Sequence, residues 1–254
     1  DTVKSIRTAL IAAFLGGAIF TLADFAAEPA APIPAPPSGP IATPPAAVHP
    51  AADNPASVEP IEKTAAGVFK LGDVQVNKAE RSITFPAEVN MDNGMLEYLL
   101  VHRRGKVHES LLRTQIDPYS LQVAFLLLGF EGTDKRLRGQ GDPATPTGER
   151  VRITLSSGVG SEKALIPVEN WLINRFRDGV KDVEPIDWVY TGSFVHQGRF
   201  MSQESGSIVA IWHDPFALID NASPGGASNA IWAVKKGTVP AVGTPVEVII
   251  TPAK

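Results

Sequence analysis

The sequence predicts an α+β domain, with a mostly antiparallel sheet or sheets packed around one buried central helix. Stretches in which apolar and polar residues alternate are typical of half-buried strands, and here they follow one another and outnumber the helical patterns. One apolar stretch, residues 121–128, is hydrophobic on nearly every side. A helix without a polar face belongs in the interior, so this one is expected to organise the core.

Composition divides the chain into three segments. Lys4 and Arg7 precede an apolar run that has the length of an export signal and is short for a full membrane span, so residues 1–27 are expected to be a signal peptide or membrane anchor. Residues 28–64 hold half of the 22 prolines and few large apolar side chains. We expect them to be a disordered, extended linker, and residues 65–254 to be one globular domain.

The first part of this domain reads as a meander. Alternating residues in 68–76 and 81–89 predict a hairpin, and 95–102 and 107–112 predict two further strands joined by a turn at Gly105.

A helix is expected to follow. Asp117 and Pro118 have the chemistry of an N-cap and a first helical residue, and Gly129 can end the helix. Residues 168–175 read as a second, short helix. The remainder is rich in predicted strands, at residues 149–155, 188–190, 194–201, 208–212, 230–234 and 246–251.

Charge and cysteine content exclude several function classes. The net charge of −4 gives no broad positive field, so no nucleic-acid partner is expected. The chain has no cysteine, which excludes disulfides, thiolate zinc sites and cysteine-ligated iron–sulfur clusters within it. No cofactor is predicted, although a divalent metal ion stays possible.

Several blocks, in order along the chain, resemble the YdjY-domain family of exported bacterial proteins. These blocks are residues 105–112, 121–129, 188–193, 210–215, 217–221 and 243–246. Together they span roughly residues 67–252. The resemblance implies one exported domain and no settled activity. Some relatives are described as ferredoxin-like, a property that would require the cysteines this chain lacks.

His108, Glu109 and Ser110 form a conspicuous polar cluster. They offer a metal-ligand pair or a serine nucleophile beside a base. On a strand, however, Glu109 would face away from the other two, and same-face neighbours lie roughly 6.5 Å apart. Local hydrogen bonding at a strand end is the simpler interpretation.

His213, Asp214 and Asp220 are the second group of candidates. Asp214 precedes Pro215 and so also fits the start of a short helix. If His108, Glu109, His213 and Asp214 or Asp220 converged, they would supply nitrogen and oxygen ligands for a divalent metal.

Lys135, Arg136 and Arg138 form a basic turn that could contact an acidic polymer or a lipid headgroup, although solvated charge is the ordinary explanation.

Two functions remain open. The first is a non-enzymatic binding or structural module of the cell envelope, located in the periplasm, on the outer surface or outside the cell. Its partner would be an envelope protein or a surface polymer, with membrane contact only through the N-terminal segment. The alternative is a metal-dependent hydrolase that uses His108, Glu109 and His213.

Overall fold

The computed structural model describes residues 60–157, 164–175 and 184–253. They belong to one compact unit that begins at Ala52. The expected signal or anchor, residues 1–27, and most of the expected linker lie outside the described residues. The last residues assigned to the linker are an exception, because residues 61–64 belong to a strand.

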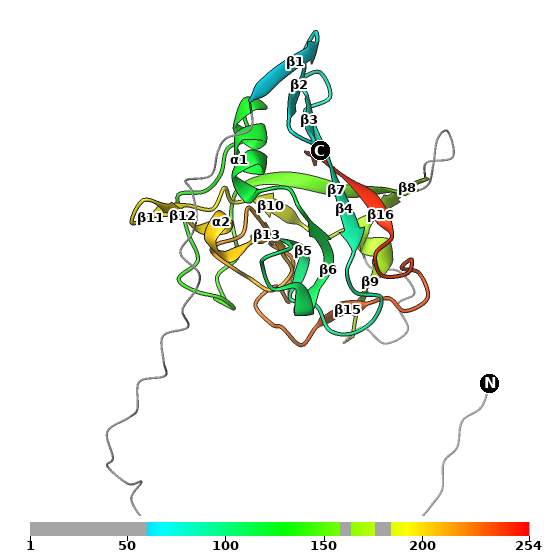
Figure 1. Cartoon of the computed structure of the whole chain (residues 1–254). Coiled ribbons are helices and arrows are strands. Elements are labelled where there is room, and N and C mark those ends of the chain that lie inside the picture. Colours follow the sequence, from blue (N-terminus) through cyan, green and yellow to red (C-terminus); the bar gives the residue numbers. More distant parts are fainter. Residues whose placement is uncertain (1–59, 158–163, 176–183, 254) are drawn as a thin grey trace, which may run out of the picture. The chain divides into compact units, whose positions relative to one another are not determined.

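Figure 1 shows strands of the described part winding around a common centre. In chain order the strands are β1 (Ile61–Ala65), β2 (Val68–Leu71), β3 (Val74–Asn77), β4 (Ser82–Val89), β5 (Tyr98–His102), β6 (Ser110–Thr114), β7 (Glu149–Ser157), β8 (Ala164–Pro167), β9 (Leu172–Asn174), β10 (Trp188–Tyr190), β11 (Val195–His196), β12 (Arg199–Phe200), β13 (Ser207–Ala210), β14 (Ile219–Asn221), β15 (Trp232–Val234) and β16 (Pro245–Pro252). The helices are α1 (Pro118–Leu127) and α2 (Met201–Ser205), with 3-10 turns at Val107–Glu109 and Val168–Trp171.

Within the described residues, eight strands close into a barrel in the order β4, β16, β7, β10, β14, β13, β5, β6. The ring closes where β6 pairs with β4, through Glu88 opposite Arg113 and Val89 opposite Leu112. Most pairs are antiparallel, but β13–β14 and β5–β6 are parallel. The expected hairpin between residues 95–102 and 107–112 is therefore wrong. The chain turns through Val107–Glu109 and re-enters beside β5 in the same direction.

The predicted α+β class is also wrong, because the domain is mostly β and no helix occupies its centre. An eight-stranded barrel is just wide enough for its own side chains to fill it. Residues such as Phe85, Ile153 and Val248, which are almost fully buried, belong to the hydrophobic core.

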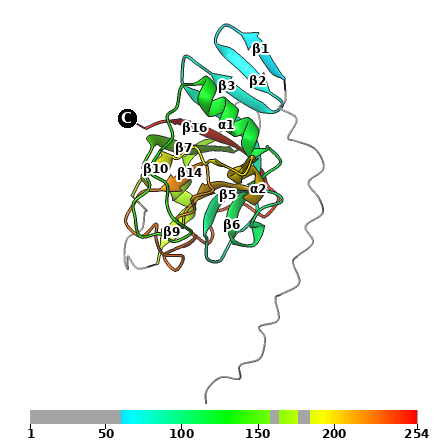
Figure 2. The ribbon, with the colours of Figure 1, turned by 90° about the vertical axis from the view of Figure 1, so that its left-hand side faces the viewer.

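The α1 helix lies beside β3 instead (Figures 1 and 2). One of its faces contributes Leu121, Ala124 and Phe125 to the core, and Phe125 stacks on Tyr190 with ring centroids 4.2 Å apart. The opposite face is only partly covered, and Leu126 is 59% exposed. None of the helices in the described ranges is long and apolar enough to cross a membrane.

Two shorter predictions are also corrected. Residues 194–201, expected as one strand, form the small hairpin β11–β12 and the first residue of α2. Residues 168–175, expected as a helix, form a 3-10 turn followed by β9.

Candidate functional site

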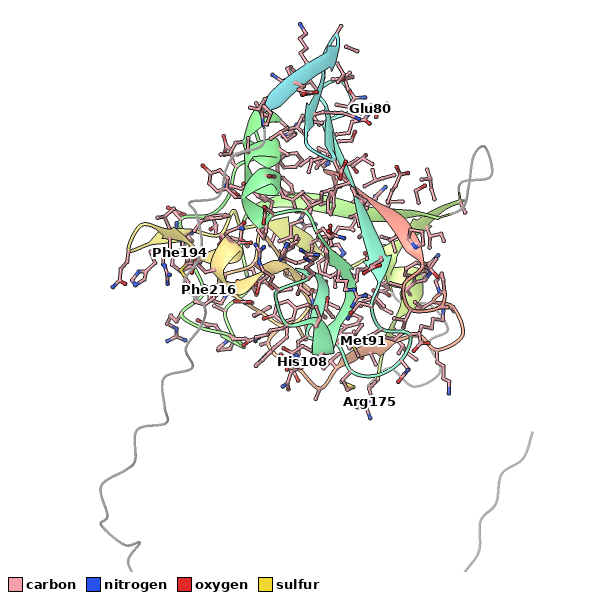
Figure 3. All side chains as sticks on the ribbon, in the orientation of Figure 1. Glu80, Met91, His108, Arg175, Phe194 and Phe216 are labelled. Atoms are coloured by element: carbon pink, nitrogen blue, oxygen red, sulfur yellow. The ribbon has the colours of Figure 1, made fainter. Side chains whose placement is uncertain are left out.

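The residues His108, Glu109 and Ser110 do not form a nucleophile and base. His108 lies on the 3-10 turn with its side chain 76% exposed, and its Nε2 is 3.7 Å from Oε2 of Glu109. Ser110 is buried at the start of β6, where its hydroxyl donates to the carbonyl oxygen of Leu112 over 2.7 Å. The hydroxyl of Ser110 therefore forms its hydrogen bond within its own strand and not with the imidazole of His108. Figure 3 shows His108 on the side of the domain where Met91 and Arg175 lie, away from Phe216.

Glu109 instead lies near a second carboxyl group, that of Glu97. Partial burial raises the pKa of Glu109, and repulsion from Glu97 and a hydrogen bond with it raise this pKa further. Lys106 and His108 oppose the shift.

The ring of His213 is buried between two backbone carbonyl groups. Nδ1 lies 2.7 Å from the carbonyl oxygen of Asp142 and Nε2 lies 2.9 Å from that of Asn221. Carbonyl oxygens only accept, so both nitrogens can donate at once only in the imidazolium form. The ring thereby connects the segment around Asp142 to β14, and neither nitrogen is directed at an open site.

Asp214 is a buried hydrogen-bond acceptor that joins three parts of the fold. Its Oδ2 accepts from the hydroxyls of Tyr98 and Ser207, each at 2.8 Å, and its Oδ1 accepts from the backbone amide of Phe216 at 2.9 Å. The expected short helix after Asp214 does not form. The carboxylate caps a turn instead, in which the amide of Ala217 donates to the carbonyl oxygen of Asp214.

Asp220 is fully buried on β14, next to Asp214. Its two oxygens accept from the backbone amides of Asp214 and Asn221, over 2.9 and 2.8 Å. Loss of hydration on burial raises its pKa well above the usual range, which outweighs the two amide donors.

These side chains do not assemble into the anticipated metal site. In the part of the chain that the structure describes, no three histidine, aspartate or glutamate side chains are arranged to hold a metal ion.

A pocket does occur where the turn after Asp214 meets residues 131–148, here called the 131–148 loop. It is shallow: the space that can hold the centre of a water molecule is about 10 Å³, and most of the surface that lines it is apolar. We name it the hydroxyl-lined pocket after its hydroxyl-bearing residues, Thr133, Thr147, Thr191 and Ser193; Asp214, Asp220, Lys135 and Arg136 also line it.

The hydroxyl groups of this pocket are fixed by the surrounding backbone. Thr191 donates to the carbonyl oxygen of Ala217 over 2.9 Å, and Ser193 donates to that of Phe216 over 2.8 Å. Thr133 and Thr147 share a hydrogen bond of 2.6 Å. A hydroxyl that donates once still has acceptor capacity, but the surface that these groups present to the pocket is small, because most of its lining is apolar.

Ser193 has a strained backbone, with a φ of 49° that side-chain-bearing residues adopt infrequently. Such strain gathers at functional sites, because the rest of the fold must maintain it. Here the serine is held by its own hydroxyl, which also accepts from the amide of Ser202 over 3.1 Å.

The 131–148 loop is anchored along its length. The amide of Gly141 donates to the carbonyl oxygen of His213 over 2.9 Å, and Gln140 donates to Tyr98 Oη over 3.0 Å. Asp142 accepts from Arg138 and from two backbone amides, and these hydrogen bonds lower its pKa. The wall of the pocket is therefore preorganised.

Sequence reasoning found Asp214 and Asp220 but assigned them to metal binding, and it missed Thr133, Thr147, Thr191 and Ser193 as one group. These hydroxyl-bearing residues are separated by up to sixty positions, and no spacing rule brings them together. The glycine at position 192, with a φ of 81°, was the one local signal of an unusual backbone there.

Comparison with known proteins supports one family. No curated protein and no solved structure matches the chain. The model of the YdjY domain matches residues 74–251, which include the eight barrel strands, except for the last residue of β16, and the residues that line the pocket. The chain therefore belongs to the YdjY domain family.

Proposed function

We propose that this domain is a non-enzymatic binding module of the bacterial cell envelope, and that it holds a polyhydroxylated surface polymer at the hydroxyl-lined pocket. The observation that carries the proposal is the convergence of four hydroxyl-bearing residues, Thr133, Thr147, Thr191 and Ser193, on one pocket. Polysaccharides present many hydroxyl groups, each of which can donate to and accept from such a wall.

The rigidity of the pocket supports binding rather than chemistry. Its hydroxyl groups are already engaged with backbone carbonyls or with one another, as for Ser193 and Thr191. A nucleophile needs a base within hydrogen-bond reach, whereas the hydroxyl of Ser193 bonds to a carbonyl oxygen and an amide. A preformed wall loses little conformational entropy when a ligand binds, so it is suited to recognition.

The envelope location rests on the sequence. Lys4 and Arg7 before an apolar run are typical of an export signal, and the proline-rich segment that follows would act as a spacer. An exported domain on a spacer can reach polymers of the cell surface.

The proposal is tested by affinity electrophoresis of the purified chain in gels that contain defined polysaccharides. Thr133→Val and Thr147→Val together remove two hydroxyls at nearly constant volume, and Thr238→Val is the matched control on an exposed turn. We expect at least one polysaccharide to retard the wild-type chain, with the dissociation constant rising about fivefold or more in the pocket variant, equivalent to roughly 1 kcal/mol.

The control variant should migrate as the wild type does. Equal retardation of the pocket and control variants, or no retardation by any polysaccharide, would contradict the pocket as the binding site. Release of new reducing ends from a bound polymer would contradict a non-enzymatic role.

A further inference from the structure

The mouth of the hydroxyl-lined pocket carries two cations that lack carboxylate partners. Lys135 and Arg136 line the pocket, and neither takes part in an ion pair within residues 60–157, 164–175 and 184–253. Their neighbour Arg138 differs, because its Nε lies 3.0 Å from Oδ2 of Asp142. Unpaired cations at the edge of a pocket can accept an anionic group without first breaking an ion pair.

Arg136 is held in place by aromatic rings. Its guanidinium carbon lies 4.5 Å from the centroid of the Phe194 ring, and Phe194 packs against Phe216 with centroids 5.7 Å apart. Figure 3 shows these two phenylalanines side by side. A guanidinium stacked on a ring keeps its N–H groups free at its edge, where they can form two parallel hydrogen bonds with an anion.

Lys135 lies on a turn that Thr133 stabilises. The hydroxyl of Thr133 accepts from the backbone amide of Lys135 over 3.0 Å and also bonds Thr147. Both cations therefore project from an anchored segment, and their approach to a ligand is preorganised.

The acidic residues of the pocket do not cancel these charges. The carboxylate of Asp214 is already surrounded by the hydroxyls of Tyr98 and Ser207 and an amide. Asp220 is fully buried, and burial raises its pKa. Asp134 is exposed beside the two cations and offsets one charge at most.

We propose that Lys135 and Arg136 bind an anionic oxygen group, a carboxylate or a phosphate, of a polyhydroxylated polymer that lies against the pocket. The ligand is then an acidic glycan. This inference rests on the proposed function, since it specifies the class of polymer that the same site takes.

The test compares polygalacturonate with its methyl ester, two polymers with the same sugar ring that differ in charge. A third arm uses a polymer of glycerol phosphate, which distinguishes phosphate from carboxylate. Lys135→Gln with Arg136→Gln removes the two cations. Lys70→Gln with Lys236→Gln is the control, because it lowers the net charge equally at exposed positions elsewhere.

We expect the wild-type chain to bind at least one acidic polymer tenfold or more tightly than the neutral ester, with an affinity that falls as salt is added. The pocket-mouth variant should lose that preference and the control variant should keep it. If neither acidic polymer bound more tightly than the neutral ester, or if the pocket-mouth variant kept the preference, the inference would be overturned and the proposed function would stand. Failure of every polymer, neutral or acidic, would count against both.

Discussion

The hydroxyl of Tyr98 donates to Oδ2 of Asp214 over 2.8 Å, although 116 positions separate the two residues. Tyr98 begins β5 and Asp214 begins the turn that leads to β14. The bond therefore fixes one wall of the pocket to the barrel. The same hydroxyl accepts from the side chain of Gln140, so Tyr98 also holds the 131–148 loop.

Replacement of Tyr98 by phenylalanine should destabilise the domain by about 1–3 kcal/mol, because Asp214 loses a donor where water cannot replace it. Urea denaturation followed by fluorescence measures the change. Tyr119→Phe is the matched control, since Tyr119 is only half-buried and no hydrogen bond of its hydroxyl occurs in the described ranges. Equal midpoints for the two variants would show that the bond to Asp214 contributes nothing.

Protonation of His102 should destabilise the fold in acid. Burial and the neighbouring Arg104 lower its pKa from 6.5 to about 4, and Asp117 opposes the shift only in part. Its Nδ1 accepts from the backbone amide of Arg104 over 3.2 Å, which requires the neutral ring. A depressed folded-state pKa means that the stabilisation is complete above the unfolded-state pKa and is lost as the pH falls through about 4.

Melting temperatures of the wild type and His102→Gln, measured from pH 7 to pH 4, test this. We expect a smaller fall for the glutamine variant, which cannot become charged. His196→Gln, at an exposed position on β11, is the control and should follow the wild type. If the melting temperatures of the wild type and the His102 variant fell in parallel, protonation of His102 would not be what destabilises the fold in acid.

Many strands could be recognised from the sequence, because apolar and polar side chains alternate along a strand in a barrel as they do in an open sheet. Sequence reasoning placed residues 149–155 and 246–251 correctly, and these lie within β7 and β16. It failed for the strand pairings and the helix position that depend on closure of the barrel. The pairing of β6 with both β4 and β5, and the exclusion of α1 from the interior, depend on contacts between distant residues.

The site was only partly predictable for the same reason. Asp214 and Asp220 were selected for their chemistry, but their environment determines what they do. The hydroxyl donors to Asp214 come from β5 and β13, and burial raises the pKa of Asp220. No local pattern encodes either effect.

Replacement of Glu109 by glutamine should stabilise the fold relative to the wild type as the pH rises. Burial, and then Glu97, raise the pKa of Glu109 above its ordinary 4.5. A raised folded-state pKa contributes stability that is complete at acid pH and is lost as the pH rises through the folded-state value. Glutamine can donate to Glu97 at every pH.

The measurement is the unfolding free energy of both proteins in urea at pH 3 and pH 7. The free energy of unfolding of the glutamine variant, minus that of the wild type, should be larger at pH 7 than at pH 3. Glu62→Gln, on the exposed strand β1, is the control and should show no such change. A shift in the opposite direction would mean that the ion pair with Lys106, at 3.7 Å, outweighs the repulsion from Glu97.

Two glycines, one in the middle of the 131–148 loop and one at its end, test how tightly this loop joins the barrel. Gly148 precedes β7 with a φ of 154°, and a Cβ there would overlap the carbonyl oxygen of Tyr190. Gly148→Ala should cost roughly 3 kcal/mol or more, because two backbones would have to separate. Gly139 has open space around its Cα, so Gly139→Ala should change stability by less than about 1 kcal/mol.

Chemical denaturation of both alanine variants gives the comparison, and affinity electrophoresis shows whether a folded Gly148 variant still binds. We expect weaker binding, because displacement of Gly148 moves Thr147 and separates its hydroxyl from that of Thr133, which now lies 2.6 Å away. If the two alanine variants were equally stable, the close approach of Gly148 to Tyr190 would not be what fixes the loop. The wall of the pocket would then depend on its other contacts, such as those of Gln140, Gly141 and Asp142.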